Sequence, residues 1–201
     1  MAKSVYGKLF DWLINKINDT LGANLATEAA VRTLHTIGVL DIFGFESFEF
    51  NSFEQLCINF CNEKLQFHFN EHIFRLEQDE YESEGIDVAA IQFKDNQPTL
   101  DLLEKKTTGI FAMIDEEISV PKGSDQGFLQ KVIKAHSSHP NFSKPRPKEK
   151  YAQEAFNVHH YAGVVKYHVT NFLEKNKDAL HKDIVSVLQS SECQFISGLF
   201  T

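Results

Sequence analysis

Apolar residues recur every four positions in the first part of the chain. They are Val5, Leu9, Leu13, Ile17 and Leu21. This spacing places them along one side of a helix, so it predicts an amphipathic helix over residues 5–21. Gly22 follows directly and is a suitable helix stop.

The segment Ile37–Phe43 has a different pattern, because it is apolar on both alternating faces. A strand with this pattern is covered from two sides inside a larger sheet. The later strand candidates alternate or are short. We therefore expect this strand to belong to a sheet completed by sequence outside these 201 residues.

Residues 52–82 predict the longest element, a helix of roughly 45 Å at 1.5 Å per residue. Two overlapping capping boxes open it, Asn51 with Glu54 and Ser52 with Gln55. In such a box the two side chains satisfy amide groups that the first helical turn leaves without partners.

The apolar face of this long helix shifts around the helix axis near Phe67 and Phe69. A helix that keeps such a face on one core must curve, so the pattern predicts a bend there. Gly85 is expected to end the helix, and Pro98 is expected to open the next one in its first turn.

The rest of the chain predicts shorter elements. The alternation on either side of Tyr161–Gly163 is typical of a small β-hairpin. The other expected elements are helices at 108–118 and 124–136 joined by a loop at 119–123, an extended solvated loop at 139–150, and helices near Phe172 and at 179–189. The predicted fold class is mainly α with a few β strands (α+β).

Composition narrows the range of partners. The net charge of −8 argues against nucleic acid, because binding a phosphate backbone needs a basic face. We find no run of eighteen apolar residues and no leader, so we expect a cytoplasmic protein without a membrane partner. The three cysteines, Cys57, Cys61 and Cys193, are expected to be reduced and buried.

An acidic residue follows the apolar strand in the run Asp41-Ile42-Phe43-Gly44-Phe45-Glu46. Nucleotide hydrolases use this arrangement to bring a carboxylate near Mg²⁺. Gly44 would let its N–H approach a phosphate oxygen, since no side chain stands in the way. Taken alone, the pattern fits an acid that caps the next turn equally well.

Longer runs decide between these two interpretations. Residues 37–46 together with 51–60 and 62–66 closely resemble the switch II strand and relay helix of the myosin motor domain. Further matches are Phe10–Leu13, Leu76–Tyr81, His160–Gly163 and Leu173–Asp178. The resemblance implies a leading helix, strand and switch II at 1–50, a relay helix and loop at 51–97, and an actin-binding part at 98–201.

The resemblance also implies roles at the nucleotide. Asp41 would lie in the outer coordination sphere of Mg²⁺, Gly44 would donate its N–H to the γ-phosphate of ATP, and Glu46 would pair with a switch I arginine. The chain contains no G-x-x-x-x-G-K-[ST] phosphate loop. We therefore expect ATP and Mg²⁺ only in an intact motor, an actin-activated Mg-ATPase, and no hydrolysis by this chain alone.

Two segments correspond to places where the family meets filamentous actin. The first is the tip of the helix-loop-helix, where the resemblance implies the main apolar contact; its residues are Ser119, Val120, Pro121 and Lys122. The second is a basic loop with Lys144, Arg146, Lys148 and Lys150. An ordinary surface turn and a solvated loop are the alternatives. The expected setting is the actin cytoskeleton.

The resemblance implies four relay residues, Phe60, Phe67, Phe69 and Val88. It also implies that the relay loop, residues 85–97, touches the converter and that the rest of the motor is a partner. Val88 stands where the family often has tryptophan, so the contact made by that tryptophan is not expected. A free-standing actin-binding module without a catalytic role is the alternative. A zinc hydrolase is a remote one, because His68, Glu71 and His72 match H-x-x-E-H.

Overall fold

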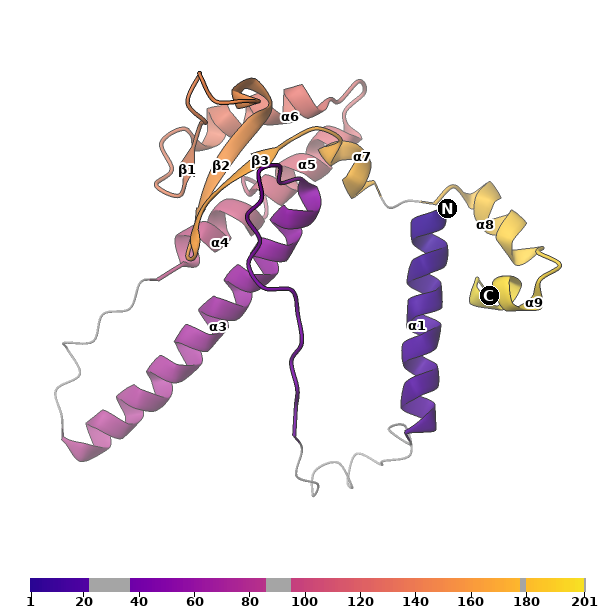
Figure 1. Ribbon diagram of the computed structural model, residues 1–201, viewed down its shortest axis with the longest axis horizontal. Helices are drawn as coiled ribbons and strands as arrows, with labels where there is room; N and C mark the ends of the chain where they lie inside the picture. The colour runs from indigo at the N-terminus through magenta and orange to yellow at the C-terminus, as the bar shows by residue number, and fades with distance from the viewer. Residues whose placement is uncertain (22–36, 86–94, 178–179, 201) are drawn as a thin grey trace. The chain divides into compact units, whose positions relative to one another are not determined.

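The computed structural model describes residues 1–21, 37–85, 95–177 and 180–200 of the 201-residue chain. The chain forms two compact units. The terminal unit combines Met1–Asp41 with Asp178–Thr201, and the central unit is Ile42–Lys177. The central unit holds the long helix and the small sheet (Figure 1).

The described part of the terminal unit contains three helices. They are α1 (Ala2–Thr20), α8 (Lys182–Gln189) and α9 (Gln194–Leu199). The first two confirm predicted helices, whereas α9 was not predicted because six residues are too few for a clear apolar period. Trp12 of α1 meets Phe195 of α9 edge-on, with ring centroids 4.9 Å apart. No residue of α1 is buried, so its apolar stripe stays exposed.

Ile37–Phe43 forms no strand among the described residues, and its place in a sheet completed by sequence outside these 201 residues stays a prediction. The segment has no regular secondary structure, and its side chains are exposed. A strand depends on neighbouring strands for its hydrogen bonds. The described residues offer this segment no such neighbour.

The central unit is built on α3 (Phe53–Glu84), which confirms the predicted long helix. Gln55 Oε1 accepts a hydrogen bond from the Ser52 N–H at 3.0 Å, which is half of the predicted box. Asn51 does not cap the helix as its predicted box requires. It exchanges hydrogen bonds with Phe48 instead, because it is drawn into the connection that precedes the helix.

The expected bend in α3 is absent, since the helix is continuous and straight (Figure 1). No proline or glycine interrupts residues 53–84. Phe69 is 59% exposed, so at this level no described core draws the helix into a curve. Gly85 ends the helix as predicted, with a φ of 71° that suits glycine.

Four shorter helices accompany α3. They are α4 (Gln97–Glu104), α5 (Ile110–Ser119), α6 (Asp125–His136) and α7 (Phe172–Asn176). Pro98 lies in the first turn of α4 as predicted. Ser124 caps α6 by accepting a hydrogen bond from the Gly127 N–H at 3.0 Å. All four confirm the helices expected from the sequence.

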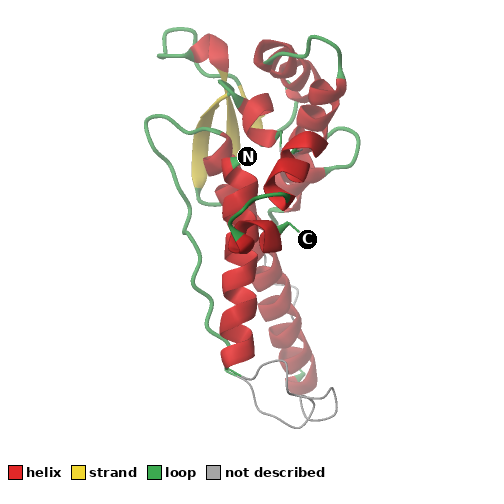
Figure 2. Ribbon diagram, turned by 90° about the vertical axis from the view of Figure 1, so that its right-hand side faces the viewer, coloured by secondary structure: helices red, strands yellow, loops and turns green. Residues whose placement is uncertain are grey.

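One antiparallel sheet completes the unit, with strand order β1-β2-β3. Its strands are β1 (Phe142–Ser143), β2 (Ala155–His160) and β3 (Gly163–His168), with a 3-10 turn at Ala152–Glu154 before β2. The strands lie together in one sheet (Figure 2). The hairpin was predicted, but β1 lies inside the segment expected to be a solvated loop. Phe142 is buried there because it stacks on Phe156.

The core lies where α3, α5, α6 and α7 meet the sheet. Phe128 of α6 and Phe156 of β2 both contact Phe172 of α7, with ring centroids 6.0 and 6.2 Å apart. Phenylalanine rings therefore form the part of the core between α6, α7 and the sheet.

Candidate functional site

The predicted switch residues lie on an exposed connection. Asp41 and Gly44 are exposed, and among the described residues no atom lies within 4 Å of a Cβ built on Gly44. Glu46 is partly buried at the end of this connection. The amide face of Gly44 is therefore open to a ligand, and no described side chain occupies that space.

The connection is fastened to α3 by side-chain amides. Asn59 accepts the Glu46 N–H and donates to the Glu46 carbonyl oxygen, both at 2.8 Å. Asn62 Nδ2 donates to the Phe43 carbonyl oxygen at 3.0 Å. Gln55 Nε2 also donates to the Glu46 carboxylate at 3.3 Å. The backbone on both sides of Gly44 therefore follows the first turns of α3.

Asn59 also begins a buried polar network. Its Nδ2 donates to the Tyr167 hydroxyl at 2.8 Å, and that hydroxyl lies 2.8 Å from His160 Nε2. His160 Nδ1 lies 2.9 Å from Glu63 Oε2, and Asn96 Nδ2 donates to Glu63 Oε1 at 2.7 Å. The network therefore joins α3, both strands of the hairpin and the start of α4.

Proton positions in the network follow from the donors available. Burial raises the pKa of the Tyr167 phenol, so the hydroxyl keeps its proton and can donate to His160 Nε2. His160 then carries its proton on Nδ1 and donates to the Glu63 carboxylate. With this assignment His160 and Tyr167 are satisfied, which is what buried polar side chains require.

The network was not predicted from the sequence. Asn59 and Glu63 are four residues apart on an otherwise apolar helical face, and His160 and Tyr167 lie at buried positions of alternating strands. Polar residues at core positions were the available signal. The contacts from α3 to the two strands join residues 108 and 97 positions apart, which no local pattern reveals.

The helix-loop-helix presents its tip to solvent. Val120 is 42% exposed, and Ser119, Pro121 and Lys122 are exposed beside it. The turn is closed by the Gly123 N–H, which donates to the Val120 carbonyl oxygen at 3.0 Å. Lys122 adopts a left-handed φ of 65°. The four predicted tip residues therefore form one ordered, partly apolar turn.

The basic residues lie between β1 and β2. The predicted cations of this loop are all exposed; they are Lys144, Arg146, Lys148 and Lys150. The loop is ordered at its end, because Glu149 accepts a hydrogen bond from the Arg146 N–H at 3.2 Å, and this bond lowers the pKa of the Glu149 carboxyl. Lys150 lies 4.9 Å from the centre of the Tyr151 ring. The loop can present several cations at once.

The predicted relay residues have different surroundings. Phe60 packs against the core and meets Phe111 edge-on at 5.1 Å. Phe67 is half-buried, whereas Phe69 is exposed. Val88 lies outside the described residues.

The H-x-x-E-H match gains no further ligand. The rings of His68 and His72 are 6.4 Å apart, and both histidines are exposed on α3. Within residues 1–21, 37–85, 95–177 and 180–200, no group of three or more His, Cys, Asp and Glu side chains could hold a metal ion. The described structure therefore gives the zinc hydrolase alternative no support.

All three cysteines are free thiols, but the expectation that they are buried was wrong for Cys61 and Cys193. Cys61 and Cys193 are exposed, and Cys57 is half-buried. Cys61 does not join the core of α3, because it follows Phe60 on a different side of the helix. Burial raises the pKa of the Cys57 thiol, and Glu54 adds to this shift.

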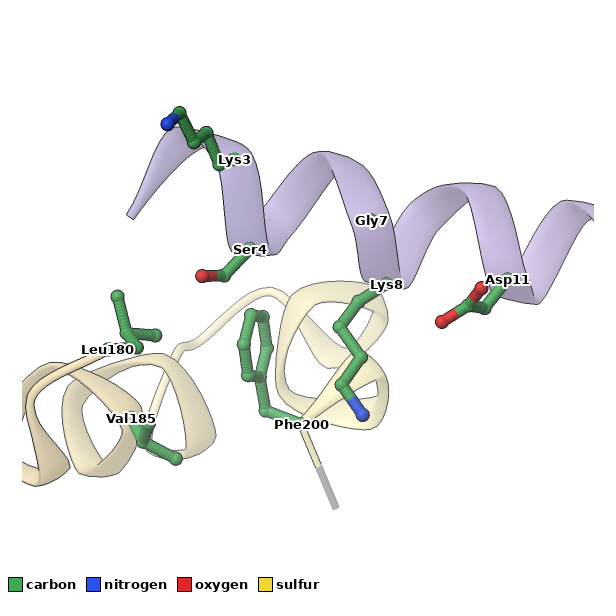
Figure 3. Close-up of a pocket in the computed structure, with 8 residues that line it drawn as sticks. All are labelled: Lys3, Ser4, Gly7, Lys8, Asp11, Leu180, Val185 and Phe200. Atoms are coloured by element: carbon green, nitrogen blue, oxygen red, sulfur yellow. The ribbon is translucent and has the colours of Figure 1, made fainter. Parts of the chain in front are cut away.

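The terminal unit has a cavity of about 440 Å³ between α1 and the segment 180–200 (Figure 3). Lys3, Ser4, Gly7, Lys8 and Asp11 of α1 line one side, and Leu180, Val185 and Phe200 line the other. None of the site residues expected from the sequence lies there. Among the helices described, none is both long and apolar enough to cross a membrane.

Comparisons with known proteins cover the whole chain. Residues 1–201 match the family model described as myosin head (motor domain). The chain is 48% identical over 201 residues to Protein OPAQUE1 of Zea mays, 50% identical over 200 residues to Myosin-7 of Arabidopsis thaliana, and 48% identical over 200 residues to Myosin-14 of the same plant. These alignments cover 100% of this chain and 13%, 11% and 12% of the three relatives.

A mainly helical chain with a small antiparallel sheet, matched over its full length in this way, is a piece of a motor-protein head. The chain belongs to the myosin motor domain family. This confirms the resemblance and the fold class expected from the sequence. The chain spans about an eighth of the length of these relatives.

Proposed function

We propose that this chain is the lower actin-binding part of a myosin motor, which couples γ-phosphate sensing to actin affinity. The observation that carries the proposal is the attachment of the Gly44 connection to α3 through Asn59 and Asn62. A displacement of this connection is passed directly to α3, because these hydrogen bonds fix its backbone to the helix.

The nucleotide end of the proposal concerns Asp41, Gly44 and Glu46. In the intact motor the Gly44 N–H would bond the γ-phosphate of ATP, Asp41 would lie in the outer coordination sphere of Mg²⁺, and Glu46 would pair with a switch I arginine. The open space at Gly44 supports this role, since a phosphate oxygen can approach its N–H. When they are bound, ATP would supply the transferred phosphoryl group and Mg²⁺ would neutralise its charge.

The relay end concerns the distal half of α3. In the intact motor, inward movement of the connection bends α3 near Phe67 and Phe69, and the movement reaches the converter through the relay loop that contains Val88. The exposure of Phe69 supports this step, because a side chain without a described core is available to neighbouring parts of the motor.

The actin end concerns the two exposed segments. The tip residues Ser119–Lys122 supply an apolar contact with filamentous actin, and the basic loop at 144–150 supplies charge for its acidic surface. Exposure of Val120 beside Lys122 supports the first role. On this proposal the protein works on the actin cytoskeleton in the cytoplasm, with the remainder of the motor as its other partner.

Co-sedimentation with filamentous actin tests the actin role. Val120→Asp is expected to weaken binding by roughly 2 kcal/mol or more, because an apolar contact is lost and a charge is desolvated. Lys144→Ala is the matched control and is expected to cost roughly 1 kcal/mol or less, since salt screens a charge at the surface. Equal losses, together with binding abolished by high salt, would show that the basic loop is the anchor.

Calorimetry with Mg-ATP tests the division of labour within the motor. We expect no measurable nucleotide affinity for this chain. It carries no phosphate loop, and it lacks the switch I arginine that would pair with Glu46. Tight binding would contradict the proposal. A second chain that carries a phosphate loop could be added to the actin-binding assay. An actin affinity that does not change on this addition would favour a free-standing actin-binding module.

A further inference from the structure

Glu117 is an unusual residue for its position. It lies in the last turn of α5, directly before the tip, and is only 6% exposed. A buried carboxylate is costly unless hydrogen bonds and a counter-charge compensate it. The burial of Glu117 therefore needs a structural reason.

The carboxylate of Glu117 spans the base of the tip. Oε1 accepts a hydrogen bond from the Ser124 N–H at 3.2 Å, and Oε2 lies 2.7 Å from the Lys131 ammonium. Ser124 is the N-cap of α6, and Lys131 lies further along that helix. The Glu117 side chain, which lies before the turn, thus binds both the Ser124 N–H and the Lys131 ammonium after it. The hydrogen bond with Lys131 lowers the pKa of Glu117 although burial opposes it, so the carboxylate stays charged.

Two glycines leave room for this arrangement. A Cβ on Gly127 would lie 2.5 Å from Glu117 Oε1 and 3.2 Å from Ser124 Oγ. A Cβ on Gly123 would collide with the Glu117 carbonyl oxygen. Glycine inside a helix such as α6 is unfavourable, so Gly127 has a packing reason here. Gly127 therefore leaves room for the Glu117 carboxylate, and Gly123 leaves room for the Glu117 backbone carbonyl.

We propose that Glu117 is a positioning residue that locks the tip turn Val120–Gly123 in the conformation that presents Val120. The functional half of this inference rests on the proposed contact between the tip and actin. A turn held in one conformation loses less entropy on binding than a mobile one, so the lock raises affinity without touching the partner.

Limited proteolysis tests the lock without actin. Trypsin cleaves after Lys122, which is exposed, and cleavage after the exposed Lys106 serves as the internal reference. Glu117→Ala is expected to raise the rate after Lys122, relative to Lys106, by about fivefold or more, since the hydrogen bond and ion pair are lost. Glu116→Ala is the matched control, because Glu116 lies 3.5 Å from the same lysine but is exposed.

Gly127→Ala is the second variant, in case Glu117→Ala does not fold. It keeps every charge and displaces the carboxylate, and we expect it to raise the same cleavage rate. Far-ultraviolet circular dichroism at the digestion temperature confirms that each variant is folded. Cleavage after Lys122 at the wild-type rate in a folded Glu117→Ala or Gly127→Ala variant overturns the inference.

Actin co-sedimentation then tests the functional half. We expect Glu117→Ala to weaken binding by about fivefold and Glu116→Ala by less than about twofold. Faster cleavage with unchanged affinity, while Val120→Asp still loses binding, overturns the functional half. Faster cleavage in a chain whose binding is also indifferent to Val120→Asp supports the lock and contradicts the proposed actin contact instead.

Discussion

The two units differ in whether they bury the apolar face of their longest helix. In the central unit, Leu56 of α3 is fully buried, and a polar network crosses the core beside it. In the terminal unit, α1 has a clear apolar stripe, yet Leu13 is 45% exposed and no residue of the helix is buried. A periodic stripe therefore predicts a helix, but it does not tell whether the chain itself covers that helix.

The difference has a simple physical origin. The central unit brings five helices and a sheet around one set of aromatic side chains, so each apolar face finds a partner. The described part of the terminal unit has three helices, two of them short. Under the proposed function, the remainder of the motor covers α1, as exposed apolar stripes commonly mark contact surfaces.

Removing the centre of the polar network should have the largest effect. Glu63→Ala removes the acceptor of His160, of the Tyr161 N–H and of one of the two Asn96 amide hydrogen bonds, so we expect the central unit to lose about 4 kcal/mol of unfolding free energy. Urea unfolding followed by tyrosine circular dichroism measures this. Glu77→Ala on the exposed half of α3 is the control, with an expected change within about 0.5 kcal/mol. Similar losses in both variants would refute a role for the network in stability.

Paired leucine substitutions compare the two units directly. Leu56→Ala should destabilise the central unit by about 3 kcal/mol, because it opens a cavity in a closed core. Leu13→Ala should destabilise the terminal unit by less than about 1 kcal/mol. Trp12, the single tryptophan, reports unfolding of the terminal unit by fluorescence. A loss at Leu13 as large as that at Leu56 would mean that α1 is packed as tightly as α3.

Acidification should give the smallest difference. Burial lowers the pKa of His136 and His168, and of His139 as well, so the folded central unit disfavours their protonated forms. The unfolded chain then binds more protons below its usual histidine pKa of about 6.5, so stability is present above that pH and falls as the pH drops.

We therefore expect the urea concentration at the midpoint of the tyrosine signal to decrease when the pH is lowered from about 7.5 to about 5.5, a range that spans the usual histidine pKa. The Trp12 midpoint is the internal control, because His181, the one histidine in the described part of the terminal unit, is exposed. A tyrosine midpoint that stays level or rises on acidification would contradict the prediction.

The helices and the hairpin could be predicted because their signals are local. The four-residue spacing in α1, Gly85 after α3, Pro98 in α4 and Ser124 before α6 each act within a few residues. The longer runs also identified the family, since they are specific over tens of residues. Hence the sequence by itself determined the fold class, most element boundaries and the family of this protein.

Tertiary structure decided what the elements do with one another. Ile37–Phe43 has the composition of a buried strand but forms none here, because strand hydrogen bonds come from neighbouring strands. Asn51 matched a helix cap but bonds Phe48 instead. Glu63, His160 and Glu117 find their partners only when separate segments meet. Side-chain contacts between such segments depend on the packed arrangement of the whole unit, and a local pattern contains no record of that arrangement.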